Sequence, residues 1–207
     1  MEAFMTPEQV QMFFTRADGS YLFARWGRPI VPVVFGVEAE TLSVMKGAIE
    51  AVVTLASHKM AEHDPELGAN LMVFFFRDWA ELPQVPNLER LVPDLGPLCD
   101  RLELAGANQY RFFRFDPDGA IKASFVFLRM DDHLAAIAAE DLALAQAAQV
   151  ILLWSDKAFV EVSPLARIED RVILRPNVAG IIRAGYARHM PVVARDASHA
   201  FRLAARL

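Results

Sequence analysis

The residues best suited to acid–base chemistry lie in a short acidic stretch in the second half of the chain. His133 is followed seven residues later by Glu140, and Asp141 is next to it. Residues seven apart share one stripe of an α-helix, so on a helix that faces a pocket Glu140 would be a general base with His133 as its partner. Acidic residues at a helix start are also expected from the helix macrodipole alone. His133, Glu140 and Asp141 are therefore candidate catalytic residues, and a purely structural role stays open for each.

The motifs that usually mark a cofactor or metal site are absent from the sequence. It contains no Gly-rich phosphate loop, no Gly-x-Ser-x-Gly turn and no Cys-x-x-Cys pair. Asp116 and Asp118 match only the start of a calcium loop and fit a turn better. His58 and Glu62 are spaced to share one helix face but fit a solvated helix end, and the single Cys99 fits a buried structural thiol. We expect no cofactor and no bound metal.

Two long helices are expected, and the second contains the three candidate catalytic residues. Apolar residues recur with helical spacing over residues 38–63, which predicts an amphipathic helix. A second, alanine-rich helix is predicted from Asp131 or Asp132 to about Trp154 and should be largely buried. Thr6 and Pro7 predict the start of a short first helix.

Strands are predicted between the helices. Leu71–Phe76 is continuously apolar, as in a strand buried on both faces. The segments 110–115 and 121–130 flank an Asp-Pro-Asp-Gly turn and predict a hairpin. The segments 21–26 and 30–35 predict two further strands, and prolines in the second favour an edge position.

The remaining segments are predicted from prolines and helix caps. Residues 78–106 are interrupted by prolines and predict an irregular excursion with short helices that serves as a lid or an interface. Beyond residue 155, Ser163-Pro164, Pro176 and Asp196 predict three helix starts. Together these elements predict one α+β domain over residues 1–207, with a mixed sheet of about five strands, two long packing helices and a helical C-terminal segment.

Composition limits the functional classes. The net charge is −5 and no recognition motif is present, so nucleic-acid binding is not expected. The apolar runs are too short to cross a membrane, and the first residues lack a signal-peptide pattern, so we expect a soluble cytoplasmic protein. Hydrophobic residues make up 54% of the chain, and apolar surface left outside the core predicts a homodimer or a higher homo-oligomer.

Two stretches resemble a bacterial zincin-like family, of metallopeptidase fold and unassigned function. They run from Leu142 through Gln146 to Asp156-Lys-Ala-Phe159, and from Leu174 to Leu207. The family carries a His-Glu-x-x-Gln motif on the helix that matches residues 132–154. Here that place reads Ala138-Ala-Glu-Asp-Leu-Ala-Leu-Ala-Gln146, with alanine where the first histidine ligand should be. Zinc sites need such imidazole ligands, so the resemblance implies a metal-free relative.

Two hypotheses of function follow from the sequence. The first is a non-catalytic, self-associating scaffold or regulatory protein, based on the missing motifs and the high apolar fraction. The second is a small-molecule-binding protein or hydrolase-like enzyme that uses the acidic residues around 131–141. A pocket that contains His133 or Glu140 would favour the second hypothesis.

Overall fold

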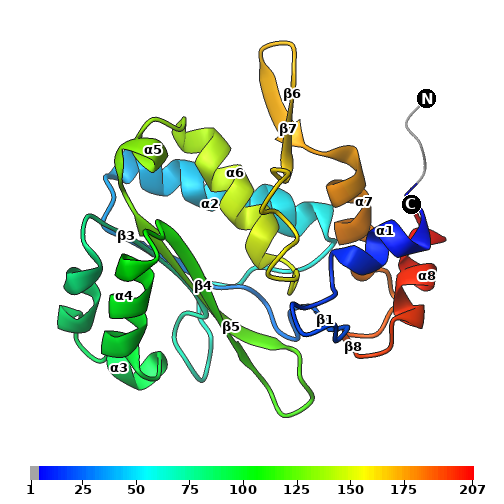
Figure 1. Ribbon diagram of the computed structural model, residues 1–207, viewed down its shortest axis with the longest axis horizontal. Helices are drawn as coiled ribbons and strands as arrows, with labels where there is room; N and C mark the ends of the chain where they lie inside the picture. The colour runs from blue at the N-terminus through cyan, green and yellow to red at the C-terminus, as the bar shows by residue number, and fades with distance from the viewer. Residues whose placement is uncertain (1–4) are drawn as a thin grey trace.

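The computed structural model describes residues 5–207 and places a four-stranded sheet at the centre of the molecule (Figure 1). The strand order is β2-β3-β5-β4, in which β2, β3 and β5 are parallel and β4 is antiparallel to β5. The strands are β2 (Pro32–Phe35), β3 (Leu71–Phe76), β4 (Gln109–Phe115) and β5 (Ile121–Arg129). The predicted α+β class is confirmed, as are the interior position of β3 and the edge position of β2.

The sheet has four strands where about five were predicted, because the segment 21–26 meets it only at an isolated parallel bridge between Trp26 and Ile121. Only Phe23–Ala24 forms a strand (β1), and it pairs with the equally short β8 (Val193–Ala194) in a separate sheet. The neighbouring backbone is used elsewhere, since Arg25 and Leu152 form an isolated bridge and Leu153 N–H donates to the Ala24 carbonyl. The segment 21–26 has the local pattern of one strand, but its residues pair with different parts of the chain.

Two helices cover one face of the sheet and lie side by side in Figure 1: α2 (Ala39–Leu55) and α6 (Ala139–Val150). The buried stripe of α2 is formed by Met45, Ile49, Val52 and Val53, as the helical periodicity predicts. On α6 the buried residues include three alanines, and small side chains of this kind permit close approach between helices. This layer forms the larger hydrophobic core together with the C-terminal elements.

The opposite face of the sheet is covered by the proline-interrupted segment. It forms a 3-10 helix, η1 (Trp79–Gln84), and two helices, α3 (Leu88–Leu91) and α4 (Leu95–Leu104). Their apolar residues pack against the phenylalanines of β3 and β5 in a second hydrophobic cluster, and Trp79 Nε1 donates to the Ala107 carbonyl at 2.8 Å. The short helices were predicted, but the segment is a packed layer of the fold and not a lid.

The predicted long helix over residues 131–154 is wrong, because the chain breaks it into two. A single turn, α5 (Asp132–Ala135), is capped by the Asp131 carboxylate, which accepts from Leu134 N–H at 2.9 Å. Ala138 then adopts an extended conformation before α6 begins, and Ile137 between them packs against the larger core. No proline or glycine marks this break, so it arises from packing and not from local propensity.

The helix predicted to start at Ser163-Pro164 is also wrong. These residues lead into a hairpin of β6 (Leu165–Ile168) and β7 (Arg171–Leu174), which projects from the body of the molecule in Figure 1. The other terminal helices form as predicted: α1 (Pro7–Met12) with a Thr6 capping box, α7 (Pro176–Gly185) and α8 (Ser198–Ala204). Within residues 5–207, none of the helices combines the length and the apolarity that a bilayer crossing requires.

The C-terminal helix carries a buried histidine. His199 Nδ1 lies 2.8 Å from the Tyr21 hydroxyl, and the imidazole packs against the Phe23 ring at 4.4 Å between centroids. Its Nε2 is enclosed and has no hydrogen-bond partner among residues 5–207. Burial, with a smaller contribution from the charge of Arg202, lowers the pKa of His199 to about 4. The folded protein therefore holds this side chain neutral.

We predict that Phe74→Asp abolishes the native fold. Phe74 is only 6% exposed and stacks between Phe35 and Phe127, so an unpaired carboxylate there costs several kcal/mol, comparable with the whole stability of a domain. Circular dichroism with a thermal melt checks this. A Phe74→Leu control should keep a cooperative transition, and a Phe74→Asp protein that melts within a few degrees of the parent would contradict the central role of β3.

We predict that acid destabilises the protein through His199. An unfolded histidine titrates near 6.5 whereas the folded His199 titrates at about 4, so between these values the unfolded chain binds the extra proton. The contribution of His199 to the free energy of unfolding is thus complete above pH 6.5. It decreases as the pH drops toward 4, with a slope of up to about 1.4 kcal/mol per pH unit. Urea unfolding across this range measures the slope. His199→Gln, which keeps an acceptor for Tyr21, should flatten it, and an unchanged slope would assign the effect to other groups such as the half-buried His58.

Candidate functional site

The sequence candidates do not assemble into one site. His133 lies exposed on α5, and Glu140 lies exposed in the first turn of α6. Asp141 is 3.7 Å from Arg167 of the β6 strand in an ion pair. The predicted shared stripe is wrong because the extended Ala138 separates the two helices. Residues 5–207 also contain no cluster of three or more His, Cys, Asp or Glu side chains able to hold a metal ion.

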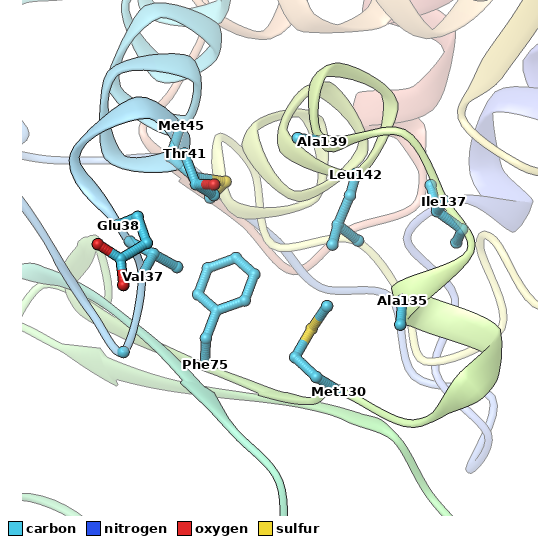
Figure 2. A pocket seen from close by; sticks show the side chains of 11 residues that line it. Val37, Glu38, Thr41, Met45, Phe75, Met130, Ala135, Ile137, Ala139 and Leu142 are labelled. Carbon is cyan, nitrogen blue, oxygen red and sulfur yellow. The ribbon is translucent and has the colours of Figure 1, made fainter.

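A cavity of about 350 Å³ does lie beside this region (Figure 2). It opens where β2, β3 and β5 end, between the first turns of α2 and α6, which is a common place for ligands in sheets with parallel strands. In Figure 2 Phe75 and Met130 rise from the strand ends toward Thr41 and Leu142 of the helices. Among residues 5–207, Glu38 is the only ionisable residue in its lining, and neither His133 nor Glu140 contributes to it. The cavity therefore lacks a paired acid and base.

A second cavity, of about 420 Å³, lies along β4 and has a different lining. We call it the β4 groove. One wall is the strand β4, and the other is the end of α6 with the chain that follows it. Its lining residues are Arg16, Gln109, Tyr110, Arg111, Phe113, Gln149, Leu153, Trp154, Ser155, Asp156, Phe159 and Val160.

Arg111 is the unusual member of the groove because its charge has no counterion. Its Nη2 donates to Gln146 Oε1 at 2.7 Å and to Gln109 Oε1 at 3.2 Å, both neutral amides. The Nε is enclosed without a hydrogen-bond partner, and no carboxylate of residues 5–207 lies within 4.0 Å. Burial lowers the pKa of Arg111 to about 10. The guanidinium is therefore still charged at neutral pH, in an environment that disfavours the charge.

The amide of Gln146 holds Arg111 in place. Gln146 is buried on the alanine-rich α6, and its Nε2 donates to Gln109 Oε1 at 2.9 Å while its Oε1 accepts from Arg111. Two glutamines from opposite walls thus fix both the position and the orientation of the guanidinium. This arrangement is preorganised, because the donor does not need to reorient when a ligand arrives.

The rest of the groove combines aromatic surface with a second cation, Arg16, which has an acidic neighbour. Trp154 and Phe159 meet edge to face with ring centroids 5.1 Å apart, and Phe14 stacks behind Trp154 at 5.4 Å. Arg16 is partly buried, which lowers its pKa, while the neighbouring Asp156 acts in the opposite direction. Arg16 therefore has an acidic neighbour and Arg111 does not, so the unbalanced positive charge is that of Arg111.

Sequence reasoning missed this site, although a signal was present. Arg111 lies between Tyr110 and Phe112 in a predicted strand, at a position whose neighbours two residues away, Gln109 and Phe113, share its face. Gln146 is a polar residue within a buried, alanine-rich helix. An inward arginine and an inward glutamine on elements that pack together indicate a polar cluster, whereas the acidic helix start at residues 131–141 indicates only a helix start.

Comparisons with protein-family models, with curated proteins and with solved structures gave no match for the chain.

Proposed function

We propose that the protein is a binding protein whose β4 groove takes a ligand bearing a carboxylate, with Arg111 as the group that recognises it. The observation that carries the proposal is a guanidinium that is enclosed at its Nε, held by two neutral amides and without a counterion among residues 5–207. The proposal corresponds to the small-molecule-binding hypothesis from the sequence, with the site moved from residues 131–141 to β4.

The energetics support a bound anion. A buried charge is normally paired, because removing it from water is costly, and neutral amides compensate that cost only in part. A ligand carboxylate at Arg111 Nη1, which makes no hydrogen bond to residues 5–207, would form a charge-assisted hydrogen bond. Such a bond contributes about 1.5–3 kcal/mol.

The aromatic wall supports a ligand with an apolar or flat portion next to its carboxylate. Trp154, Phe159 and Phe113 all line the groove, and sites for small ligands typically combine apolar walls with a few fixed polar groups. Of the residues that the structure describes, no histidine lines the groove, and the one carboxylate in its lining, Asp156, lies beside Arg16. These features favour recognition over catalysis.

We predict that Arg111→Gln weakens binding of trans-cinnamate by at least about tenfold, since a charge-assisted hydrogen bond is lost. Isothermal titration calorimetry measures the affinity, with the neutral cinnamamide as a ligand control. Arg114→Gln is the matched protein control, because Arg114 lies on the same strand at a position of the opposite face, and it should change the affinity by less than about twofold.

A second variant distinguishes a loss of binding from a loss of folding. Gln146→Glu places a carboxylate next to Arg111 without changing the size of the side chain, so the folded protein supplies its own counterion. This variant should stay folded and still lose cinnamate binding. Equal binding of cinnamate by the parent and by both variants would exclude Arg111 as the recognition group.

We propose self-association as a second property, on the basis of exposed apolar side chains that follow the groove. Val160 is 75% exposed, Val162 52% and Ile168 55%, and apolar side chains exposed to solvent are candidates for an association surface. Light scattering after size exclusion should give a dimer or larger, unchanged at high salt because hydrophobic contact is not screened. Ile168→Asp should shift it toward monomer. A parent protein of monomer mass at micromolar concentration would refute the oligomer.

A further inference from the structure

The strand that carries Arg111 has one open edge. Within residues 5–207, β4 pairs only with β5, and the sheet order ends with it. Arg129 N–H donates to the Asn108 carbonyl at 2.8 Å, which makes Asn108 and Arg129 a hydrogen-bonded pair. In an antiparallel ladder such pairs alternate with pairs whose backbone groups point outward. The backbone groups of Tyr110 and Phe112 therefore face β5.

The same alternation turns Gln109, Arg111 and Phe113 outward. Their registered partners on β5 are Leu128, Val126 and Ser124, and these are the non-hydrogen-bonded pairs of the ladder. No other backbone hydrogen bond within residues 5–207 uses the N–H or C=O groups of these three residues. The same three residues, Gln109, Arg111 and Phe113, also line the β4 groove. The groove thus presents free backbone donors and acceptors next to an unpaired cation.

We infer that the ligand of the β4 groove is an extended peptide that adds to the sheet as a strand beside β4 and places a carboxylate on Arg111. The inference rests on the proposed function and specifies its ligand. Strand addition supplies affinity through main-chain hydrogen bonds, and side-chain pockets supply specificity. Here the backbone of Gln109, Arg111 and Phe113 would supply the main-chain hydrogen bonds. The side chain of Arg111 and the aromatic wall would supply the specificity.

Charge favours an acidic peptide over a second copy of this chain at the same edge. If two β4 strands paired symmetrically near their centres, Arg111 would lie close to Arg111 of the other copy, and like charges opposed across a ladder are destabilising. Neither copy would then gain a counterion. An acidic residue opposite Arg111 satisfies the guanidinium and the ladder together.

The test uses the full chain and peptides of about seven residues, since three outward residues of β4 span about 13 Å at roughly 3.3 Å per residue. The parent peptide is fluorescein-labelled Thr-Val-Thr-Glu-Thr-Val-Thr amide, and anisotropy measures its affinity. A glutamine version tests the carboxylate, and a version without glutamate but with a free C-terminal carboxylate tests the other source of the same group. Arg111→Gln should weaken binding of the glutamate peptide at least tenfold, and Arg114→Gln by less than twofold.

Two N-methylated peptides test strand pairing. One carries the methyl group on the glutamate amide and the other on the amide that follows. Adjacent amides of a strand point to opposite sides, so in either strand direction one of them faces β4 and the other faces away. One peptide should bind at least tenfold more weakly than the parent and the other within about twofold. Equal affinities of the two methylated peptides would overturn strand addition.

A parallel titration with trans-cinnamate separates this inference from the proposed function. One outcome is that cinnamate binds through Arg111 while the peptides do not bind, or bind with an affinity that methylation does not change. That result would refute the peptide ligand and leave the carboxylate site in place. If neither cinnamate nor the glutamate peptide depends on Arg111, both are refuted. Anisotropy of a labelled β4 peptide, Gln-Tyr-Arg-Phe-Phe-Arg-Phe, reports edge-to-edge pairing of two copies, and binding tighter than that of the glutamate peptide would overturn the preference for an acidic partner.

Discussion

The central strands of the sheet must be covered on both faces, and most of the architecture follows from this constraint. Successive side chains of β3 alternate between the two hydrophobic clusters, so Val73 belongs to one and Phe74 to the other. The same alternation in β5 joins Val126 to the first cluster and Phe127 to the second. Helices are therefore required on both sides, and the irregular segment 78–106 supplies the second layer. What remains accessible of the sheet is its ends and its edges.

The two cavities described above lie at open parts of the sheet. The ends of the parallel strands open into the apolar cavity of Figure 2, and the edge strand β4 borders the groove that contains Arg111. The polar groups are concentrated in the groove, because an edge position allows a long charged side chain to point inward without entering either core. The proposed binding site is thus at the edge of the sheet, although parallel strand ends are the more usual place for ligands.

Sequence patterns predicted the elements whose local signals and packing agree. The amphipathic stripe of α2, the turn between β4 and β5 and the apolar run of β3 all combine propensity with burial. The failures are segments in which packing overrides propensity: Ala138 interrupts an alanine-rich helix, and Ser163-Pro164 leads into a hairpin. The prediction of the functional site failed for a related reason. The proposed role of Arg111 depends on the absence of a nearby carboxylate among residues 5–207, and only the fold shows which side chains are neighbours.

Inward-pointing charges on edge strands also have a protective role, because they discourage pairing with other sheets. That role requires only that the charge oppose an incoming strand, and a mobile arginine exposed to water would suffice. Arg111 is instead fixed by two glutamines, with its Nε enclosed and its pKa lowered by burial. Holding a cation rigid in an unfavourable environment decreases stability and adds nothing to protection against nonspecific strands. Under the proposed function it would increase the selectivity for a strand that carries a carboxylate, since such a strand pairs the charge of Arg111. In the proposed function, protection and recognition would therefore be one property of this edge: Arg111 would repel a basic strand, would gain no counterion from a neutral one and would admit an acidic one.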